Sequence, residues 1–248
     1  MKQLGLIGHP LTHSFSKKYY ENKFLKEGIV GYVYDLFDLS SIEEFHKVLQ
    51  KENLIGVNVT IPYKEAVLPF LDEIEPAAKS MQAVNCIRIR KNNNKLFLKG
   101  FNTDIIGFKK SLHPLLAPHH KAALILGNGG AAQAVKKALE DLHISYSIIS
   151  RSPKGENQYS YDQIDEKMMN THPVVINCSP VGTFPNIDEK PDIPYSFISK
   201  NHLFYDLIYN PEETKFLEIA RKAGAKTKNG YEMLVLQAEE NWKIWNET

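Results

Sequence analysis

A short apolar segment followed at once by a glycine-rich turn lies in the middle of the chain, and it constrains the fold more than any other feature. Residues 122–126 (Ala-Ala-Leu-Ile-Leu) have the composition of a buried strand, and Gly127-Asn128-Gly129-Gly130-Ala131-Ala132 follows directly. In the G-x-G-x-x-G/A pattern the first glycine makes a tight turn and the second lets the backbone approach a diphosphate. The third small residue lets the next helix pack close to the strand. The segment therefore predicts a strand–turn–helix unit that binds a dinucleotide.

The residues after the next predicted strand indicate which dinucleotide binds. Residues 145–149 form a second apolar segment that ends at Ser150-Arg151-Ser152, with Lys154 close by. Proteins that bind NAD usually place a carboxylate about twenty residues after the turn, where it binds the ribose 2′-hydroxyl. A guanidinium between two small hydroxyls suits a 2′-phosphate instead. We therefore expect the cofactor to be NADP.

Composition and charge exclude several classes of function. The 248 residues are 43% hydrophobic and 24% charged, with a net charge of +1, so nothing indicates a nucleic-acid groove or an anionic membrane surface as partner. The chain starts Met1-Lys2-Gln3-Leu4 without a signal-peptide core, and no apolar run is long enough to span a bilayer. Cys86 and Cys178 are far apart and match no metal spacing. We expect a cytoplasmic protein in a reducing compartment, either a monomer or a homodimer.

The first hundred residues alternate between the two kinds of secondary structure. Residues 4–8, 31–37 and 54–59 have strand character, whereas residues 16–26 and 42–50 have helical spacing. Such alternation predicts a parallel sheet covered by helices. Residues 85–90 and 96–101 flank a lysine- and asparagine-rich run at 91–95, which predicts a hairpin with its turn in that run.

The second half of the chain repeats this alternation after a connecting helix. Residues 104–116 are expected to form that helix, with Asn102 or Thr103 as its cap. Strands are then expected at 122–126, 145–149, 174–177, 203–206 and 225–227. A last helix carries an apolar stripe from Tyr231 through Ala238 to Trp245, and we expect it to return to the first unit. The fold class is thus α/β, with an N-terminal α/β domain and a doubly wound, Rossmann-like parallel-sheet domain.

Four polar segments lie at predicted strand ends, where α/β proteins bind ligands, and each has a plain structural alternative. Ser14 and Ser16 could bind a carboxylate at a helix start, or cap that helix. Lys64 could transfer a proton or be a solvated surface charge. Asp104 could be a catalytic acid or a helix cap, and Asn85 could hold a hydroxyl or a turn.

A metal site is not expected. His9 and His13 lie four residues apart, but Pro10 interrupts any helical pair between them.

Taken together, these segments resemble the motifs of the shikimate dehydrogenase family. The resemblance runs from Gly8 to Gln237. It rests on the runs Gly8–Ser16, Asn58–Lys64, Ala83–Asn85 and Gly100–Asp104 in the first part of the chain. It also includes Asn177–Gly182, Tyr205–Pro211 with Thr214, and Asn229–Val235 with Gln237-Ala238.

The resemblance implies a reversible, NADP-dependent reduction of 3-dehydroshikimate to shikimate. It implies a substrate-binding domain at residues 1–103, on which 230–248 packs, and an NADP-binding Rossmann domain at 104–229. The implied catalytic pair is Lys64 and Asp104. The implied substrate-binding residues are Ser14, Ser16, Thr60, Asn85, Tyr209 and Gln237. The implied cofactor-binding residues are Gly127, Asn128, Gly129, Gly130, Ala131, Ser150, Arg151, Ser152 and Gly230.

Two other functions stay open at this level. The basic motif is commonly Asn-Arg-Thr in this family and is Ser150-Arg151-Ser152 here, while Cys86 and Ser179 stand where threonine is common. A broader quinate/shikimate dehydrogenase would differ around Ser14 and Ser16. A catalytically silent sensor of shikimate-like acids or nucleotide would be expected to lack the lysine or the acid, and this chain has both.

Overall fold

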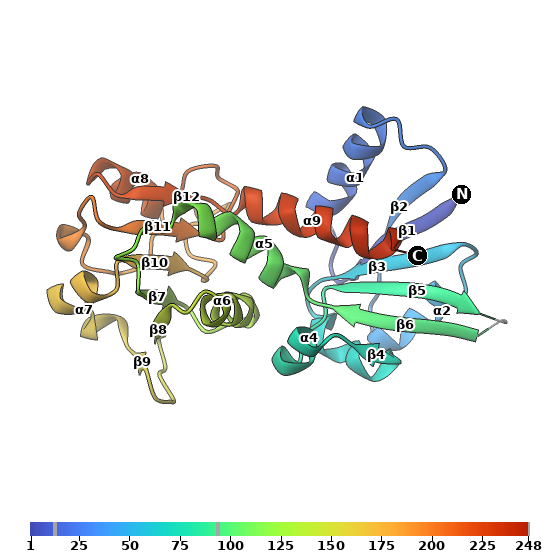
Figure 1. The fold of residues 1–248 in the computed structure, drawn as a ribbon, viewed down its shortest axis with the longest axis horizontal. Helices are drawn as coiled ribbons and strands as arrows, with labels where there is room; N and C mark the ends of the chain where they lie inside the picture. The colour runs from blue at the N-terminus through green and yellow to red at the C-terminus, as the bar shows by residue number, and fades with distance from the viewer. Residues whose placement is uncertain (12–13, 93–94, 248) are drawn as a thin grey trace. The chain divides into compact units, whose positions relative to one another are not determined.

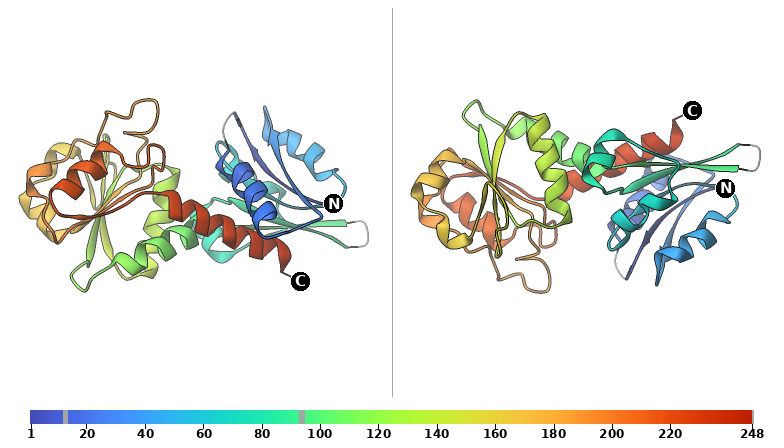
Figure 2. Two further views of the ribbon diagram at one scale, coloured as in Figure 1. Left: turned by 90° about the horizontal axis from the view of Figure 1, so that it is seen from above. Right: turned by 90° about the horizontal axis from the view of Figure 1, so that it is seen from below.

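The chain divides into two compact units. The computed structural model describes residues 1–11, 14–92 and 95–247, and Figures 1 and 2 show its ribbon. Unit 1 comprises Met1–Thr103 and Gln237–Thr248, and unit 2 comprises Asp104–Leu236. Each unit contains its own sheet and its own buried core.

Unit 1 is built on a mixed sheet with strand order β2-β1-β3-β5-β6-β4. The strands are β1 (Lys2–Gly8), β2 (Tyr32–Asp38), β3 (Leu54–Val59), β4 (Glu73–Ile74), β5 (Cys86–Asn92) and β6 (Lys95–Phe101). The strand β1 runs parallel to β2 and β3, whereas β5 is antiparallel to both β3 and β6. The predicted hairpin is therefore confirmed as the β5–β6 pair, and residues 93–94 of its predicted turn lie outside the described residues.

Helices cover both faces of this sheet. They are α1 (Phe15–Lys26), α2 (Phe45–Leu49), α3 (Tyr63–Ala66), α4 (Pro76–Met81) and the C-terminal α9 (Tyr231–Asn246). One core includes Val57, Phe45 and Ala78, and brings α2 and α4 against one face. The other core includes Leu4, Tyr20 and Trp245, and brings α1 and the end of α9 against the opposite face. The ribbon shows α9 beside α1 at this sheet (Figure 1 and the left view of Figure 2).

The C-terminal helix is therefore part of the first unit's core, as its apolar stripe predicts. The Trp245 Nε1 donates to the carbonyl of Ile87 at 3.0 Å, and the Tyr20 hydroxyl donates to the carbonyl of Ala238 at 2.7 Å. The stripe does not extend over the whole helix, because Tyr231 is exposed.

Unit 2 contains a parallel sheet with strand order β12-β11-β10-β7-β8-β9. The strands are β7 (Ala122–Leu126), β8 (Ser145–Ile149), β9 (Gln158–Tyr159), β10 (Val174–Asn177), β11 (Leu203–Asp206) and β12 (Lys226–Lys228). Numbered within the unit, this order is 3-2-1-4-5-6, the order of dinucleotide-binding folds. The order reverses between β7 and β10, so their carboxyl ends flank the place where such folds bind their ligand.

Alternating side chains attach helices to both faces of the second sheet. Its helices are α5 (Thr103–Leu112), α6 (Gly130–Asp141), α7 (Glu166–Thr171) and α8 (Lys215–Lys222). Phe204 packs on Phe216 of α8, with ring centroids 4.9 Å apart. The next residue, Tyr205, points to the other face, where its ring meets Phe108 of α5 at 4.9 Å and its hydroxyl lies 2.6 Å from Ser111 Oγ. The doubly wound architecture expected from the sequence is confirmed.

The expected cap of α5 is wrong. Asn102 Oδ1 is buried without a hydrogen-bond partner, and the Asn102 amide donates instead to the carbonyl of Ala83 at 3.0 Å. Thr103 is itself the first helical residue, and its hydroxyl donates to Asn241 at 2.6 Å. The Thr103 hydroxyl thus bonds a tertiary partner, whereas the Asn102 oxygen that could cap the helix makes no hydrogen bond.

A single glycine allows α9 to pack onto the first sheet. Gly56 of β3 pairs with Leu4 of β1 and Arg88 of β5, and a Cβ placed on it would lie 2.2 Å from Trp245 Cδ1. The Trp245 indole is 5% exposed and is fixed by its bond to Ile87, so it cannot move aside at low cost.

We expect Gly56→Ala to lower the free energy of unfolding by about 1–3 kcal/mol, the usual cost of overpacking a core. Urea denaturation monitored by tryptophan fluorescence measures it. Gly130→Ala is the matched control, since a Cβ there would have no atom within 4 Å. Equal stability of the two variants would contradict this account of the Trp245 contact.

Candidate active site

The first helix of unit 1 begins with the two predicted carboxylate-binding serines. Ser14 is the N-cap of α1, and its Oγ accepts from the Lys17 amide at 3.2 Å. The Ser16 hydroxyl hydrogen-bonds the buried Tyr34 hydroxyl, which also donates to Asn58 Oδ1 at 2.8 Å. Burial raises the pKa of Tyr34, so the phenol stays protonated as a donor. The capping alternative for Ser14 is thus confirmed, and Tyr34 holds Ser16 in place.

Lys64 lies on the short helix α3, which starts just beyond the carboxyl end of β3. Its carbonyl accepts from the Val84 amide at 2.8 Å, so its main chain lies beside the segment that leads to Asn85. The neighbouring Tyr63 is buried, and its hydroxyl donates to the carbonyl of Leu39 at 2.5 Å. The Tyr63 backbone amide donates to the carbonyl of Thr60 at 2.9 Å. Backbone hydrogen bonds on both sides therefore fix the main chain of Lys64 near the carboxyl end of β3.

Asn85 lies between three segments of unit 1. Its carbonyl accepts from the Val59 amide at 2.9 Å, and its own amide donates to the carbonyl of Phe101 at 3.0 Å. Its side-chain Oδ1 accepts from the Thr103 amide at 2.8 Å. These bonds place the ends of β3 and β6 and the start of α5 around one buried side chain. Asp104 is the next residue of α5.

Asn85, Thr103, Gln237 and Asn241 form a buried group that we call the amide cluster. Thr103 Oγ1 donates to Asn241 Oδ1 at 2.6 Å, and Asn241 Nδ2 donates to Gln237 Oε1 at 3.0 Å. All four side chains are at most 6% exposed. The cluster brings the predicted residues Asn85 and Gln237 together within unit 1.

A cavity of about 890 Å³ lies within unit 2, at the carboxyl ends of β7, β8 and β10. Its lining includes Gly127, Asn128, Gly129, Ser150, Arg151, Ser152, Lys154, Cys178, Ser179 and Lys190. The glycine turn and the basic motif, which the sequence places more than twenty residues apart, thus face one cavity. Its size is that of a ligand pocket for a large organic molecule.

Backbone geometry explains the glycines of the turn. Gly127 has φ +102°, and a Cβ on it would lie 3.2 Å from the Ser179 amide, so only glycine fits comfortably. Gly129 is the N-cap of α6 and makes no side-chain cap bond. A Cβ added to Gly129 or to Gly130 would have no neighbouring atom within 4 Å. The open space and the helix N-terminus suit an anionic group.

The basic motif contributes a positive charge to this cavity and contains a buried hydroxyl. Ser150 Oγ is buried and lacks a hydrogen-bond partner. Arg151 is exposed. Burial raises the pKa of Tyr161, and the nearby Arg151 charge opposes that rise. Burial raises the pKa of the Cys178 thiol, so this cavity-lining group is not a thiolate nucleophile. An exposed guanidinium and a protonated thiol therefore line the same cavity.

Asp206 holds the loop that forms one wall of the cavity. Asn177 Nδ2 donates to Asp206 Oδ1 at 3.1 Å, and Asn177 Oδ1 accepts from Ser179 Oγ at 2.6 Å. Asp206 also accepts from the Ile208 amide at 3.0 Å and from Thr214 Oγ1 at 2.6 Å. The carboxyl is fully buried, and burial raises its pKa to about 6 against the lowering effect of these donors.

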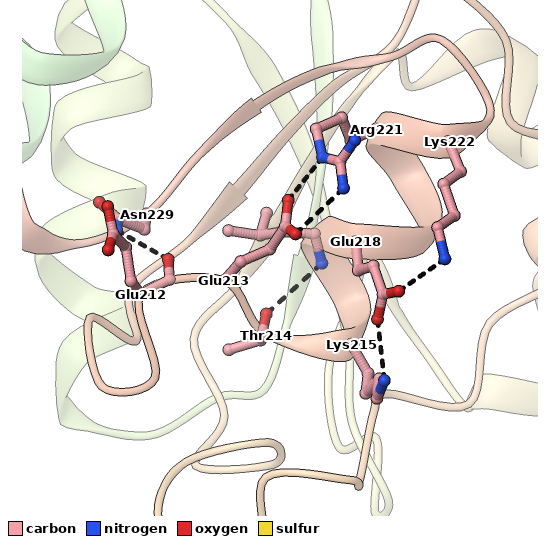
Figure 3. Close-up of polar contacts among 9 residues, drawn as sticks. Glu212, Glu213, Thr214, Lys215, Glu218, Arg221, Lys222 and Asn229 are labelled. Atoms are coloured by element: carbon pink, nitrogen blue, oxygen red, sulfur yellow. Dashed lines mark hydrogen bonds and ion pairs between the residues drawn. The ribbon is translucent and has the colours of Figure 1, made fainter.

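A smaller cavity of about 450 Å³ in unit 2 is lined by Glu212, Glu213, Leu217, Thr227, Lys228 and Asn229. Figure 3 shows that Glu213 pairs with Arg221, and that Glu218 bridges Lys215 and Lys222. Asn229 Nδ2 donates to the carbonyl of Glu212 at 2.9 Å. Lys228 pairs with Glu232. The charges near this cavity therefore neutralise one another, and they give it no strong preference for an ion.

The predicted site residues are divided between the units. Ser14, Ser16, Thr60, Lys64, Asn85 and Gln237 belong to unit 1, whereas Asp104, Tyr209, Gly230 and the other cofactor residues belong to unit 2. Gly230 has a structural role of its own, because a Cβ there would lie 2.1 Å from the carbonyl oxygen of Leu207.

Several residues of these sites were not predicted from the sequence. Tyr34 and Asn58 support Ser16, Asn241 contacts Gln237, and Tyr161 and Lys190 line the larger cavity. Two of them left a signal in the sequence. Asn58 interrupts an apolar strand, and Asn241 lies one helical turn after Gln237.

No group of three or more metal-ligating side chains gathers within residues 1–11, 14–92 and 95–247. His9 Nδ1 bonds Asp38 at 2.6 Å, and His13 lies outside the described residues. Nor does the described part of the chain contain a helix whose length and apolar character would let it cross a membrane.

The raised pKa of Asp206 predicts a pH-dependent stability. The folded chain keeps this proton up to about pH 6, whereas an unfolded aspartate loses it near 3.8. The stabilising effect is complete below about pH 4 and is lost as the pH rises through about 6. A shift of this size corresponds to roughly 3 kcal/mol at about 1.36 kcal/mol per pKa unit.

We expect Asp206→Asn, which cannot ionise, to remove that dependence. Free energies of unfolding measured from pH 4 to pH 7 should fall more steeply in the wild type than in the variant. Parallel profiles would show that Asp206 titrates normally.

Comparison with known proteins identifies the family. Residues 6–87 match the family model described as shikimate dehydrogenase substrate binding domain. The chain is 38% identical over 260 residues to a shikimate dehydrogenase (NADP(+)) of Methanococcus maripaludis, covering 98% of this chain and 91% of that one.

Solved structures agree with this result. A shikimate dehydrogenase in complex with NADP+ superimposes with a TM-score of 0.84 at 33% identity, covering 99% of this chain and 90% of the other. A shikimate 5-dehydrogenase of Listeria monocytogenes, in complex with shikimate and NAD, gives 0.87 at 27% identity, with coverages of 100% and 92%. The chain belongs to the shikimate dehydrogenase family.

Proposed function

We propose that the protein catalyses the reversible, NADP-dependent reduction of 3-dehydroshikimate to shikimate. The observation that carries this proposal is the cavity of unit 2, where the glycine turn and Arg151 face one space. Family membership supports it, because the relatives named above are shikimate dehydrogenases that use or bind nicotinamide dinucleotides. The enzyme is therefore an oxidoreductase that acts on a secondary alcohol, and its partners are small molecules in the cytoplasm.

The two units have different roles in this proposal. Unit 1 binds the substrate, in keeping with the match of residues 6–87 to a substrate binding domain. In this proposal Ser14 and Ser16 bind the carboxylate, and Thr60, Asn85 and Gln237 bind ring oxygens. Tyr209, which belongs to unit 2, assists with the carboxylate. The α1 N-terminus favours an anion at Ser14 and Ser16, since its first amides point toward that end.

Unit 2 holds the cofactor, and three observations fit a 2′-phosphorylated dinucleotide. Gly127, Asn128 and Gly129 form a turn, and Gly130 and Ala131 begin the helix that follows it, with open space beside Gly129 and Gly130. Ser150 Oγ is buried without a partner, and Arg151 and Ser152 line the same cavity. Gly230 would contact the nicotinamide side of the bound cofactor. When bound, NADP accepts or supplies the hydride.

The protein's own residues handle the proton. Oxidation of a secondary alcohol removes a hydride from carbon and a proton from oxygen, and reduction adds both. In the reducing direction the Lys64 ammonium donates a proton to the oxygen on which negative charge develops. Asp104 orients the amine and holds a neighbouring ring hydroxyl. The Lys64 main chain is bonded to Val84, and Asp104 follows Thr103, which is bonded to Asn85, so one buried segment supports both residues.

Lys64→Ala should lower kcat by about 10²–10⁴, the usual contribution of a proton-transfer group. Steady-state absorbance of reduced nicotinamide, with shikimate and NADP as substrates, measures it. Lys47→Ala is the control, since that lysine is exposed and its ammonium pairs with Glu44 on the surface. Normal turnover by the Lys64 variant would refute its role.

Arg151→Ala should raise KM for NADP by about 10- to 100-fold and leave KM for NAD unchanged. A charge-assisted hydrogen bond contributes about 1.5–3 kcal/mol, and about 1.4 kcal/mol is a factor of ten. Arg221→Ala removes the same charge from the surface shown in Figure 3 and should change neither value. An equal loss for both cofactors would make Arg151 a structural residue.

The same assay separates the proposed function from a broader quinate/shikimate dehydrogenase. Turnover of shikimate without turnover of quinate supports the narrow function. Comparable rates on the two acids would favour the broad one, and absence of turnover on either would favour a sensor.

A further inference from the structure

The amide cluster also determines which way its side-chain amides are oriented. Asn241 lies one turn after Gln237 on α9 and is completely buried. Both polar atoms of its side chain form hydrogen bonds. Oδ1 accepts from Thr103 Oγ1 at 2.6 Å, and Nδ2 donates to Gln237 Oε1 at 3.0 Å. Because every member has few donors and acceptors, the bonds of one member decide what the next can offer.

The two distances assign the protons. A separation of 2.6 Å is ordinary for O–H···O but short for N–H···O, so the single Thr103 hydroxyl proton points to Asn241 Oδ1. The contacts of Thr103 Oγ1 with Asn85 Oδ1 at 3.2 Å and with Gln237 Oε1 at 3.5 Å are longer. The Asn241 amide must then turn its NH₂ toward Gln237, which explains the N–H···O distance of 3.0 Å.

Two predicted ligand-binding amides are thereby oriented in the same sense. Gln237 Oε1 is used as an acceptor within the cluster, and this leaves Nε2 as the group that Gln237 can offer. Asn85 Oδ1 accepts from the Thr103 amide at 2.8 Å, which leaves Asn85 Nδ2. Both residues can therefore offer N–H donors, and a ligand must meet them with acceptor oxygens.

We propose that Asn241 is a positioning residue for substrate recognition, which holds the Gln237 amide so that it donates to a ring oxygen of the substrate. The inference rests on the proposed function, in which Gln237 contacts the substrate. A ring hydroxyl that accepts from Gln237 keeps its own proton for a different acceptor. The orientation therefore selects which oxygen of a polyhydroxy acid is bound as an acceptor.

Asn241→Asp tests this proposal because it preserves size and reverses one bond. The new carboxylate still accepts from Thr103 but cannot donate to Gln237 Oε1. The Gln237 amide must turn over, and it then offers an acceptor where the substrate needs a donor. We expect KM for shikimate to rise about tenfold or more, with KM for NADP within about twofold of wild type.

A double-mutant cycle with Gln237→Ala separates orientation from the added negative charge. Orientation acts only through Gln237, so Asn241→Asp should change KM for shikimate by less than about twofold in the Gln237→Ala background. An equal rise in both backgrounds would overturn the proposal, because repulsion between the carboxylate and an anionic substrate would persist without Gln237.

Asn246→Asp is the matched control on the same helix. Its side-chain amide likewise accepts a hydrogen bond from a hydroxyl, that of Tyr32 at 2.5 Å, and donates one to a carbonyl, that of Trp242 at 2.8 Å. It should leave both KM values unchanged. Should Asn241→Asp not fold, as judged by thermal unfolding, Asn241→Ala takes its place in the same cycle.

The outcome also distinguishes this proposal from the one it rests on. A wild-type protein that turns over neither shikimate nor 3-dehydroshikimate would refute the proposed function. Normal wild-type turnover, with an unchanged KM for shikimate in Gln237→Ala, would remove Gln237 from the substrate and refute the role of Asn241.

Discussion

The rest of unit 1 depends on the hydrogen bonds made by the buried side chain and the backbone of Asn85. Through them, Val59 at the end of β3, Phe101 at the end of β6 and Thr103 at the start of α5 are bonded to one residue. The amides of Val59 and Thr103 would otherwise be buried polar groups without a partner, which costs more than the bond itself contributes. The same residue is a predicted contact for substrate, so the scaffold and the site share one set of bonds.

In unit 2 a buried carboxyl group, that of Asp206, likewise bonds several segments together. Asp206 and Asn177 end neighbouring strands and bond each other, and Asn177 then fixes Ser179 opposite the glycine turn. Burial keeps the Asp206 pKa high, so near neutral pH the loop is held by a group close to its titration point. The wall of the cofactor cavity thus depends on a buried acid that does not face the cavity.

Much of the fold could be predicted, because local patterns determine it. The bounds of β7, β8, β10 and β11 match the segments expected from their apolar runs, and the switch point at Gly127 follows from the glycine turn. The cap of α5 could not be predicted, because Asn102 and Thr103 are bonded to Ala83 and Asn241, far away in the sequence. Tyr34 was missed for the same reason, because its importance comes from a long-range hydrogen bond to Asn58. Asn58 and Asn241 left only a weak local signal, and the contacts that make them important are likewise long-range.

The contribution of α9 to the first core has a consequence for the order of folding during synthesis. Chains usually fold domain by domain from the N-terminus as they leave the ribosome. Here residues 104–236 form a continuous unit, whereas the first unit lacks Ala238, Ile244 and Trp245 until the last part of the chain has emerged. The segment that is translated first is therefore expected to complete its packing last. The rings of Tyr20 and Tyr34 can pack on the Trp245 indole only after α9 has been synthesised.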